Sequence, residues 1–193
     1  MIQPQIVKDF ITEDERQELV AWILEHRETE FFQYSNMGRV DTQWTTRYWG
    51  QQGEDMNLLK FPSVVYSIQA RVRNLLNLSD TNSKLPPFKD GIAAYYYTDQ
   101  AGIKEHTDAI WYPGTYTVHA NIIVQPADSG GITRIGTDYW PTGPADLLVY
   151  PVSHVSHRVN RCVGSTPRLL WTWAFCPLTH VYDPTTNSYI NQL

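Results

Sequence analysis

The first third of the chain spaces its apolar residues with a helical period. Residues 10–26, FITEDERQELVAWILEH, begin with Thr12 and Glu15 in the spacing of a capping box, and apolar side chains then recur along one helix face. Residues 62–78, PSVVYSIQARVRNLLNL, start at Pro62 and carry a similar apolar stripe. The pattern therefore predicts two helices, each with a packing face.

After about residue 85 the pattern changes to short apolar runs separated by Gly, Pro, Asp and Asn, which is typical of antiparallel sheets. These runs are GIAAYYYT (91–98), TYTVHANIIVQP (115–126), GITRIG (131–136), ADLLVYPV (145–152), SHRVN (156–160) and RLLWTWAFC (168–176), and the threonine-rich RVDTQWTTRYWG (39–50) also predicts extended structure. We expect a mainly β fold with N-terminal helices, whose core is a jelly roll of about seven or eight strands. One domain spans residues 1–193, with helical support over about 1–85 and the β-core over about 86–180.

The composition agrees with a globular chain, since 42% of the residues are hydrophobic and 18% are charged. The aromatic share of 13% favours pleated, half-buried surfaces. The formal net charge is −5, with both signs interspersed, so the sequence lacks the basic stripe that binds phosphate backbones. We therefore expect no nucleic-acid partner.

The two cysteines, Cys162 and Cys176, have no metal-like spacing and are expected to be reduced thiols. The N-terminus has no apolar signal core, and no apolar run is long enough to span a bilayer. The expected location is the cytoplasm, without membrane attachment.

The sequence KEHTDAIW holds the first candidate metal ligands, His106 and Asp108. Residues two apart on a strand point to the same face, so this pair presents an imidazole nitrogen and a carboxylate oxygen side by side. His154 and His157, in SHVSHRVN, are candidates for the third ligand. Two histidines and one carboxylate leave three positions open, which suits non-haem Fe(II).

Four ordered segments over residues 92–175 resemble the Fe(II)- and 2-oxoglutarate-dependent dioxygenases, and the prolyl-4-hydroxylase-like branch in particular. The segments are YYYTDQAGIKEHTD, IIVQPADSGGITRI, GPADLLVYPVSHVSHRV and GSTPRLLWTWAF. The first is similar to the tyrosine–glycine–H-x-D segment of that family, the second to its Gly-Gly-x-Thr turn, the third to its distal-histidine strand, and the last to its closing strand.

The resemblance implies a double-stranded β-helix whose His106, Asp108 and His157 hold Fe(II), with 2-oxoglutarate as co-substrate and O2 as oxidant. It favours His157 over His154 as the distal ligand, because His157 stands further past Tyr150 and just before Val159. His154 then becomes a possible edge of the pocket. The histidines at 26, 119 and 180 are expected to have no special role.

The resemblance also places the 2-oxoglutarate anchor at Arg168, eleven residues after His157. A guanidinium group pairs with a carboxylate through two hydrogen bonds and stays charged. Arg168 lies in an apolar strand, where an unpaired charge is costly, so it needs an anionic partner. However, Arg168 and Trp173 fall on opposite faces of that strand unless a bulge intervenes, which departs from the family pattern.

Tyr97, nine residues before His106, corresponds to a tyrosine that often faces the co-substrate or substrate in the family. Tyr96 would take that place if the strand had the other parity. Trp111 and Tyr112 are possible pocket residues at the mouth of the site.

The function that the resemblance implies is decarboxylation of 2-oxoglutarate coupled to hydroxylation of an unactivated C–H, on a prolyl or other amino-acid side chain. The acceptor is a peptide, a protein or a small molecule, and the sequence leaves the oligomeric state open. Two alternatives remain: an inactive β-helix binding module, and a cupin-like metalloenzyme that does not use 2-oxoglutarate. Nucleic-acid demethylases of the superfamily carry a second arginine where this chain has Ala174, which argues against that activity.

Overall fold

The computed structural model describes residues 2–28, 32–33, 39–40, 43–49, 61–78, 90–110, 114–177, 180–183, 185 and 188–191. Within these ranges, the side chains of 2–28, 61–78, 90–110, 114–177 and 185 are described. No helix in this part of the chain is both long and apolar enough to cross a membrane.

Both predicted helices are present, as α1 (Glu13–His26) and α2 (Ser63–Leu75). The capping box of α1 forms as the sequence predicts. Thr12 Oγ1 accepts a hydrogen bond from the Glu15 backbone N–H at 3.2 Å, and Glu15 Oε2 accepts one from the Thr12 N–H at 2.9 Å. These two bonds satisfy donors that a helix N-terminus otherwise leaves unpaired.

Two antiparallel sheets form the body of the fold. The larger sheet has seven strands in the order β1 (Gln5–Val7), β11 (Leu147–Tyr150), β7 (Val118–Gln125), β14 (Arg168–Phe175), β5 (Gly91–Tyr97), β4 (Gln43–Trp49) and β2 (Phe32–Gln33). The smaller has five, in the order β10 (Asp138–Trp140), β9 (Thr133–Ile135), β12 (His157–Val159), β6 (Gly102–His106) and β3 (Arg39–Val40). Two further ladders pair β13 (Cys162–Val163) with β8 (Ser129–Gly130), and β15 (His180–Asp183) with β16 (Ser188–Asn191).

The expected jelly roll is confirmed, with two differences in detail. The extended structure predicted over 39–50 is present as β3 and β4, but β1 and β2 were not predicted, and all four strands join one of the two sheets. The described part of the expected core also holds ten strands, β5 to β14, rather than seven or eight. The extra strands are two or three residues long, and such short strands form through tertiary pairing that a local pattern does not reveal.

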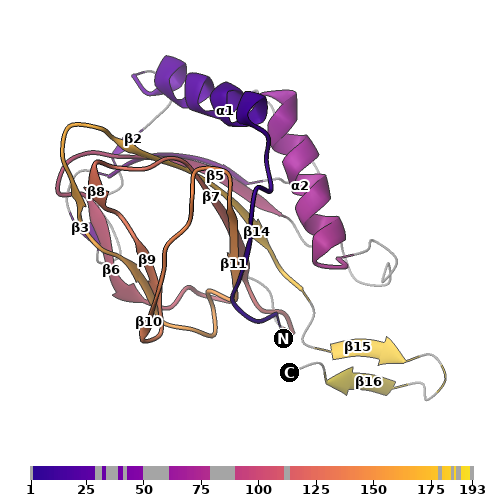
Figure 1. The fold of residues 1–193 in the computed structure, drawn as a ribbon. Helices are drawn as coiled ribbons and strands as arrows, with labels where there is room; N and C mark the ends of the chain where they lie inside the picture. Colours follow the sequence, from indigo (N-terminus) through magenta and orange to yellow (C-terminus); the bar gives the residue numbers. More distant parts are fainter. Residues whose placement is uncertain are drawn as a thin grey trace.

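The two helices cover the outer face of the larger sheet, and the smaller sheet lies on its other side (Figure 1). Strand β14 shows how the sequence builds these layers. Leu169, Trp171, Trp173 and Phe175 belong to the core cluster that the helices share, whereas Leu170 belongs to the cluster on the opposite face. The indole N–H groups of Trp171 and Trp173 donate to backbone carbonyls of the helices, at 3.3 and 3.0 Å.

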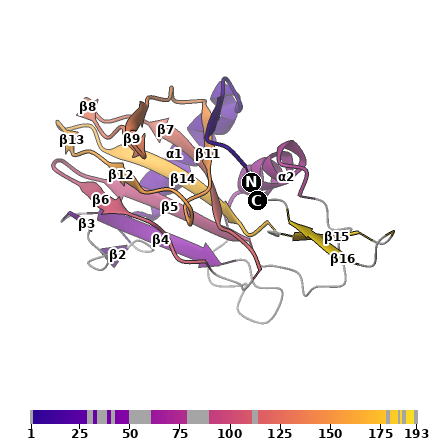
Figure 2. The ribbon, with the colours of Figure 1, turned by 90° about the horizontal axis from the view of Figure 1, so that it is seen from below.

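The inner face of the larger sheet, which looks toward the smaller sheet, is the face that positions the candidate site (Figure 2). Arg168 shares this face with Leu170, while Trp173 faces the helices. The pairing of β14 with β5 is regular from 168 to 174. The register shift lies between β14 and β7, where Leu169 pairs with Gln125 and Leu170 with Ile123. The extra residue is therefore on β7, and the opposite orientation of Arg168 and Trp173 stands.

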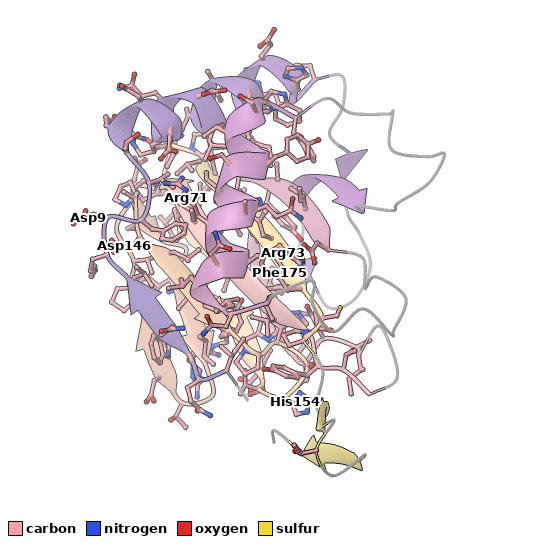
Figure 3. All side chains as sticks on the ribbon, turned by 90° about the vertical axis from the view of Figure 1, so that its right-hand side faces the viewer. Asp9, Arg71, Arg73, Asp146, His154 and Phe175 are labelled. Carbon is pink, nitrogen blue, oxygen red and sulfur yellow. The ribbon has the colours of Figure 1, made fainter. Side chains whose placement is uncertain are left out.

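The N-terminal segment is fastened to β11 by the buried carboxylate of Asp146 (Figure 3). Asp146 Oδ2 accepts from Lys8 Nζ at 2.6 Å and from the Gly143 N–H at 2.7 Å, and Oδ1 accepts from the Asp9 N–H at 3.2 Å. Burial raises the pKa of Asp146, but Lys8 and the two backbone donors outweigh burial and leave the pKa below its ordinary value.

We expect Asp146→Asn to lower the free energy of unfolding by about 1–3 kcal/mol near neutral pH, because an amide NH2 replaces a buried oxygen that accepts from N–H donors. Since the folded pKa of Asp146 is lowered, its contribution is present above the unfolded pKa and disappears as the pH falls through the folded value. Urea unfolding at several pH values should show the two proteins converge in acid. The exposed Asp138→Asn is the control, and a gap that stays constant with pH would contradict this account.

Candidate metal site and anion pocket

The structure brings His106, Asp108 and His157 together. His106 ends β6 and His157 begins β12, and the two are direct partners in the antiparallel pairing of these strands. One ligand atom from each of the three residues lies within 4.8 Å of the others. His157, which follows Asp108 by 49 positions in the sequence, thus joins His106 and Asp108 in one cluster of two imidazoles and a carboxylate.

A β-bulge on β6 aims His106 at this cluster. His157 pairs with His106 and Val159 with Ile103, so three residues of β6 span the distance of two on β12. The extra residue lets both Ile103 and His106 face inward, although their spacing alone would put them on opposite faces. Just beyond the strand, the Asp108 N–H donates to the Val152 carbonyl at 3.0 Å and fixes the turn that carries the carboxylate.

Both histidines direct Nε2 to the cluster. His106 Nδ1 lies 2.8 Å from the Lys104 carbonyl, and His157 Nδ1 lies 3.3 Å from the Val155 carbonyl. A carbonyl only accepts, so each Nδ1 carries a hydrogen. The neutral ring then has its lone pair on Nε2, which is the form that binds a metal ion.

The electrostatics of the cluster also suit a cation. Burial raises the pKa of Asp108, but a hydrogen bond from His106 and the charges of His119, His157 and His106 outweigh burial and hold the pKa well below its usual range. Burial and the charge of His106 lower the pKa of His157. Asp108 is therefore ionised and His157 neutral near pH 7, as metal ligands must be.

Arg168, the predicted anchor, is 1% exposed and points its guanidinium at the inner face of β5, where Cζ lies 4.8 Å from the centre of the Tyr97 ring. Among the described residues, Arg168 Nε and Nη1 have no hydrogen-bond partner. Gly131, with φ of +65°, makes room for this side chain, because a Cβ there would stand 2.7 Å from Arg168 Cδ. Two buried donors of this cation are therefore available to an anion.

Tyr97 lies on the same inner face and is fully buried, and its strand partner is Arg168. Tyr96, the alternative candidate on the other face of β5, packs against the helix-side core instead. His154 is exposed and contacts Ser153 and Tyr116 at the end of the molecule away from α1, so the structure does not bring it into the metal cluster (Figure 3). Trp111 and Tyr112 lie outside the described residues.

Two polar residues on β7 join the site, and the sequence patterns did not single them out. His119 Nε2 lies 3.5 Å from Asp108 Oδ2, and Asn121 Nδ2 donates at 3.1 Å to the buried Tyr150 hydroxyl. The signal was present in VHANIIV: Val118, Ala120, Ile122 and Val124 all face the helices, so the polar residues between them face inward. By contrast, His26 stacks on Trp22 in α1.

No protein-family model matches the sequence, and no curated protein matches it either. Solved structures do match. A Pseudomonas putida prolyl-4-hydroxylase aligns with a TM-score of 0.68 and 16% identity, over 89% of this chain and 91% of its own. The viral collagen prolyl hydroxylase of Paramecium bursaria Chlorella virus-1, solved as a 2OG complex, aligns with a TM-score of 0.64 and 11% identity, over 92% and 97%.

A Trichoplax adhaerens prolyl hydroxylase, in complex with a hypoxia inducible factor peptide fragment, gives a TM-score of 0.59 and 16% identity, over 89% of this chain and 83% of its own. An AlkB homologue, OsALKBH1, gives 0.61 and 14%, over 90% and 98%. The chain has the fold of the Fe(II)/2-oxoglutarate dioxygenases. At identities of 11–16% the alignments establish the fold alone.

We expect the protein to bind one divalent cation at the cluster, and Asp108→Ala to weaken that binding. Removal of a residue that hydrogen-bonds to a metal ligand weakens metal binding about 10- to 100-fold. Removal of the ligand itself should weaken it at least as much. Anaerobic calorimetry with Fe(II), supported by Co(II) absorption, measures the binding. Asp138→Ala, on the exposed strand β10, is the matched control, and unchanged affinity in Asp108→Ala would place the metal elsewhere.

Proposed function

We propose that this protein is a non-haem Fe(II) hydroxylase that uses 2-oxoglutarate and O2. The observation that carries the proposal is the buried guanidinium of Arg168, two of whose nitrogens have no hydrogen-bond partner among the described residues. It lies on the face of the larger sheet that looks toward the smaller sheet, and the smaller sheet carries His106 and His157 of the ligand cluster. A group of metal ligands alone would fit many enzymes. A buried cation that faces the sheet carrying two of the ligands fits a co-substrate that chelates a metal ion and also carries a second carboxylate.

The three ligands fit Fe(II) by their chemistry. Two neutral imidazoles and one carboxylate are the ligand set that non-haem Fe(II) oxygenases use with open positions for other ligands. His106, Asp108 and His157 would hold the ion, which supplies the oxygen chemistry that no side chain can perform. The protein's own part is to fix these ligands, to bind the co-substrate and to keep the reaction away from water.

Arg168 would bind the distal carboxylate of 2-oxoglutarate through Nε and Nη1, which have no other hydrogen-bond partner among the described residues. Tyr97 holds the guanidinium by a cation–π contact and would line the co-substrate beside it. Ile123 and Leu170 pack on the same inner face and form an apolar lining that excludes water from the charge.

The acceptor is proposed to be a prolyl or another amino-acid side chain, in a peptide or protein or as a small molecule. The resemblance of the four sequence segments to the prolyl-hydroxylase branch supports it, and so do the folds of the solved prolyl hydroxylases. The net charge of −5 is a reason to prefer these acceptors to nucleic acid, although an AlkB homologue shares the fold. The cytoplasmic location stays a prediction.

Two alternatives from the sequence predict different oxygen consumption. An inactive binding module would consume no oxygen with Fe(II) and 2-oxoglutarate present. A cupin-like enzyme would consume it without 2-oxoglutarate, and would leave Arg168 without a ligand. Uptake that requires 2-oxoglutarate, with a substrate gaining one oxygen atom by mass, supports the proposed function.

Arg168→Met separates a functional arginine from a structural one. Because two guanidinium nitrogens are unpaired, their loss should leave the unfolding free energy of the ligand-free protein within about 1 kcal/mol of wild type, or above it. The affinity for 2-oxoglutarate should fall about 10- to 100-fold, since a hydrogen bond to a charged group contributes about 1.5–3 kcal/mol. Urea unfolding and anaerobic calorimetry measure the two quantities.

The matched control is Arg161→Met, because Arg161 is exposed and close in sequence. This variant should change neither quantity. If Arg168→Met loses several kcal/mol of stability while 2-oxoglutarate affinity is kept, Arg168 supports the fold and the co-substrate anchor lies elsewhere.

A further inference from the structure

We propose that His119 is a positioning residue that holds Asp108 in place when the metal ion is bound. This inference rests on the proposed function, because it concerns the same metal cluster. His119 itself is not in that cluster: the group of mutually close ligand atoms among the described residues contains only His106, Asp108 and His157. Its role is to hold the Asp108 carboxylate through a contact with Oδ2.

The two oxygens of Asp108 face different histidines. Oδ1 lies 3.1 Å from His106 Nε2, and Oδ2 lies 3.5 Å from His119 Nε2. A cation at the cluster takes the lone pair of His106 Nε2, so His106, whose ring hydrogen lies on Nδ1, gives Asp108 no hydrogen bond in the metal-bound state. His119 Nε2 is the other nitrogen in contact with the carboxylate in the described part of the chain, so His119 is the residue that can donate to Asp108 in that state.

Strand β7 gives His119 a rigid base. The strand is central in the larger sheet, paired with β11 on one side and β14 on the other, and His119 is opposite Tyr150 and Ala174. Thr117, the residue just before β7, contacts the next residue of the turn, since its Oγ1 donates to the Ala109 carbonyl at 3.2 Å. Asp108 and Ala109 therefore contact two nearby residues, one at the start of β7 and one just before it.

An inward-facing histidine on a central strand is costly to bury unless its ring makes a polar contact. The residues on either side, Val118 and Ala120, are fully buried in the helix-side core, whereas the His119 side chain is 16% exposed and contacts a carboxylate. An apolar residue at position 119 would fill the space without desolvating a polar ring. The polar contact with Asp108 is the feature that only a donor at this position provides.

The contact also limits how Asp108 binds a cation. With Oδ2 engaged by His119, the carboxylate offers the ion Oδ1 alone. Without that contact the carboxylate is free to offer both oxygens, and the second would fill a position that the co-substrate needs. Loss of the His119 donor should therefore weaken the binding of the metal and, in the metal-loaded protein, of 2-oxoglutarate.

The test compares His119→Leu, which removes the donor, with His119→Gln, which keeps an amide N–H at a similar distance from the backbone. His26→Gln, on α1, is the matched histidine control. Fe(II) and Co(II) affinities are measured anaerobically against a competing chelator, and 2-oxoglutarate affinity by calorimetry on the loaded proteins. Thermal unfolding of the metal-free proteins reports whether each variant folds.

We expect His119→Leu to bind metal about 10- to 100-fold more weakly, which is the usual effect of losing a residue that hydrogen-bonds to a metal ligand. The metal affinity of His119→Gln should remain close to that of the wild type. Equal affinity in His119→Leu and wild type would overturn the inference, and so would an equal loss in both variants. A Co(II) spectrum that loses a nitrogen ligand in both variants would make His119 a ligand and also overturn it. A wild type that binds no metal would instead refute the proposed function.

Discussion

A buried positive charge on the inner face of the larger sheet is the constraint around which the site is arranged. The Arg168 guanidinium lies in a strand whose other face packs two tryptophans against helices, so it cannot turn to solvent. Its Tyr97 contact offsets part of the burial cost, but two nitrogens keep unused donors. Such an arrangement lowers the stability of the fold unless an anion binds to the unused donors. An ordinary apolar core carries no such cost.

The strict alternation of the central strands makes this possible. On β7 and β14, one set of side chains forms the apolar core with the helices, and the alternate set faces the smaller sheet. The first set provides stability, and the second is then available for Arg168, His119 and Asn121. The smaller sheet completes the site from the opposite side, because the pairing of β6 with β12 sets His106 beside His157.

The sequence predicts the features that depend on local patterns. The capping box at Thr12, the two helices and the runs that became β5, β7 and β14 are all visible in the periodicity. The inward direction of Tyr97, by contrast, depends on which face of β5 the helices cover, and a strand of three consecutive tyrosines does not show this. The structure places Tyr97 beside Arg168, while its role toward the co-substrate stays a prediction.

Other features could not be read from the pattern. The bulge on β6 exists only relative to β12, more than fifty residues away, so the inward direction of both Ile103 and His106 follows from pairing. The sequence alone assigns His119 no special role, because an isolated histidine in an apolar run resembles a core residue. Its meaning becomes visible once its neighbours on β7 are known to face the helices and Asp108 is known to lie opposite.

The central claim is that the facing sides of the two sheets bind Fe(II) and 2-oxoglutarate together. The most direct measurement is anaerobic absorption, in which Fe(II) and then 2-oxoglutarate are added and the visible region is searched for the weak band of an iron–keto-acid complex. The account predicts this band in the wild type, its absence in His106→Ala, and a higher 2-oxoglutarate concentration for half-saturation in Arg168→Met. A folded wild type that shows no band and no calorimetric binding would contradict the account.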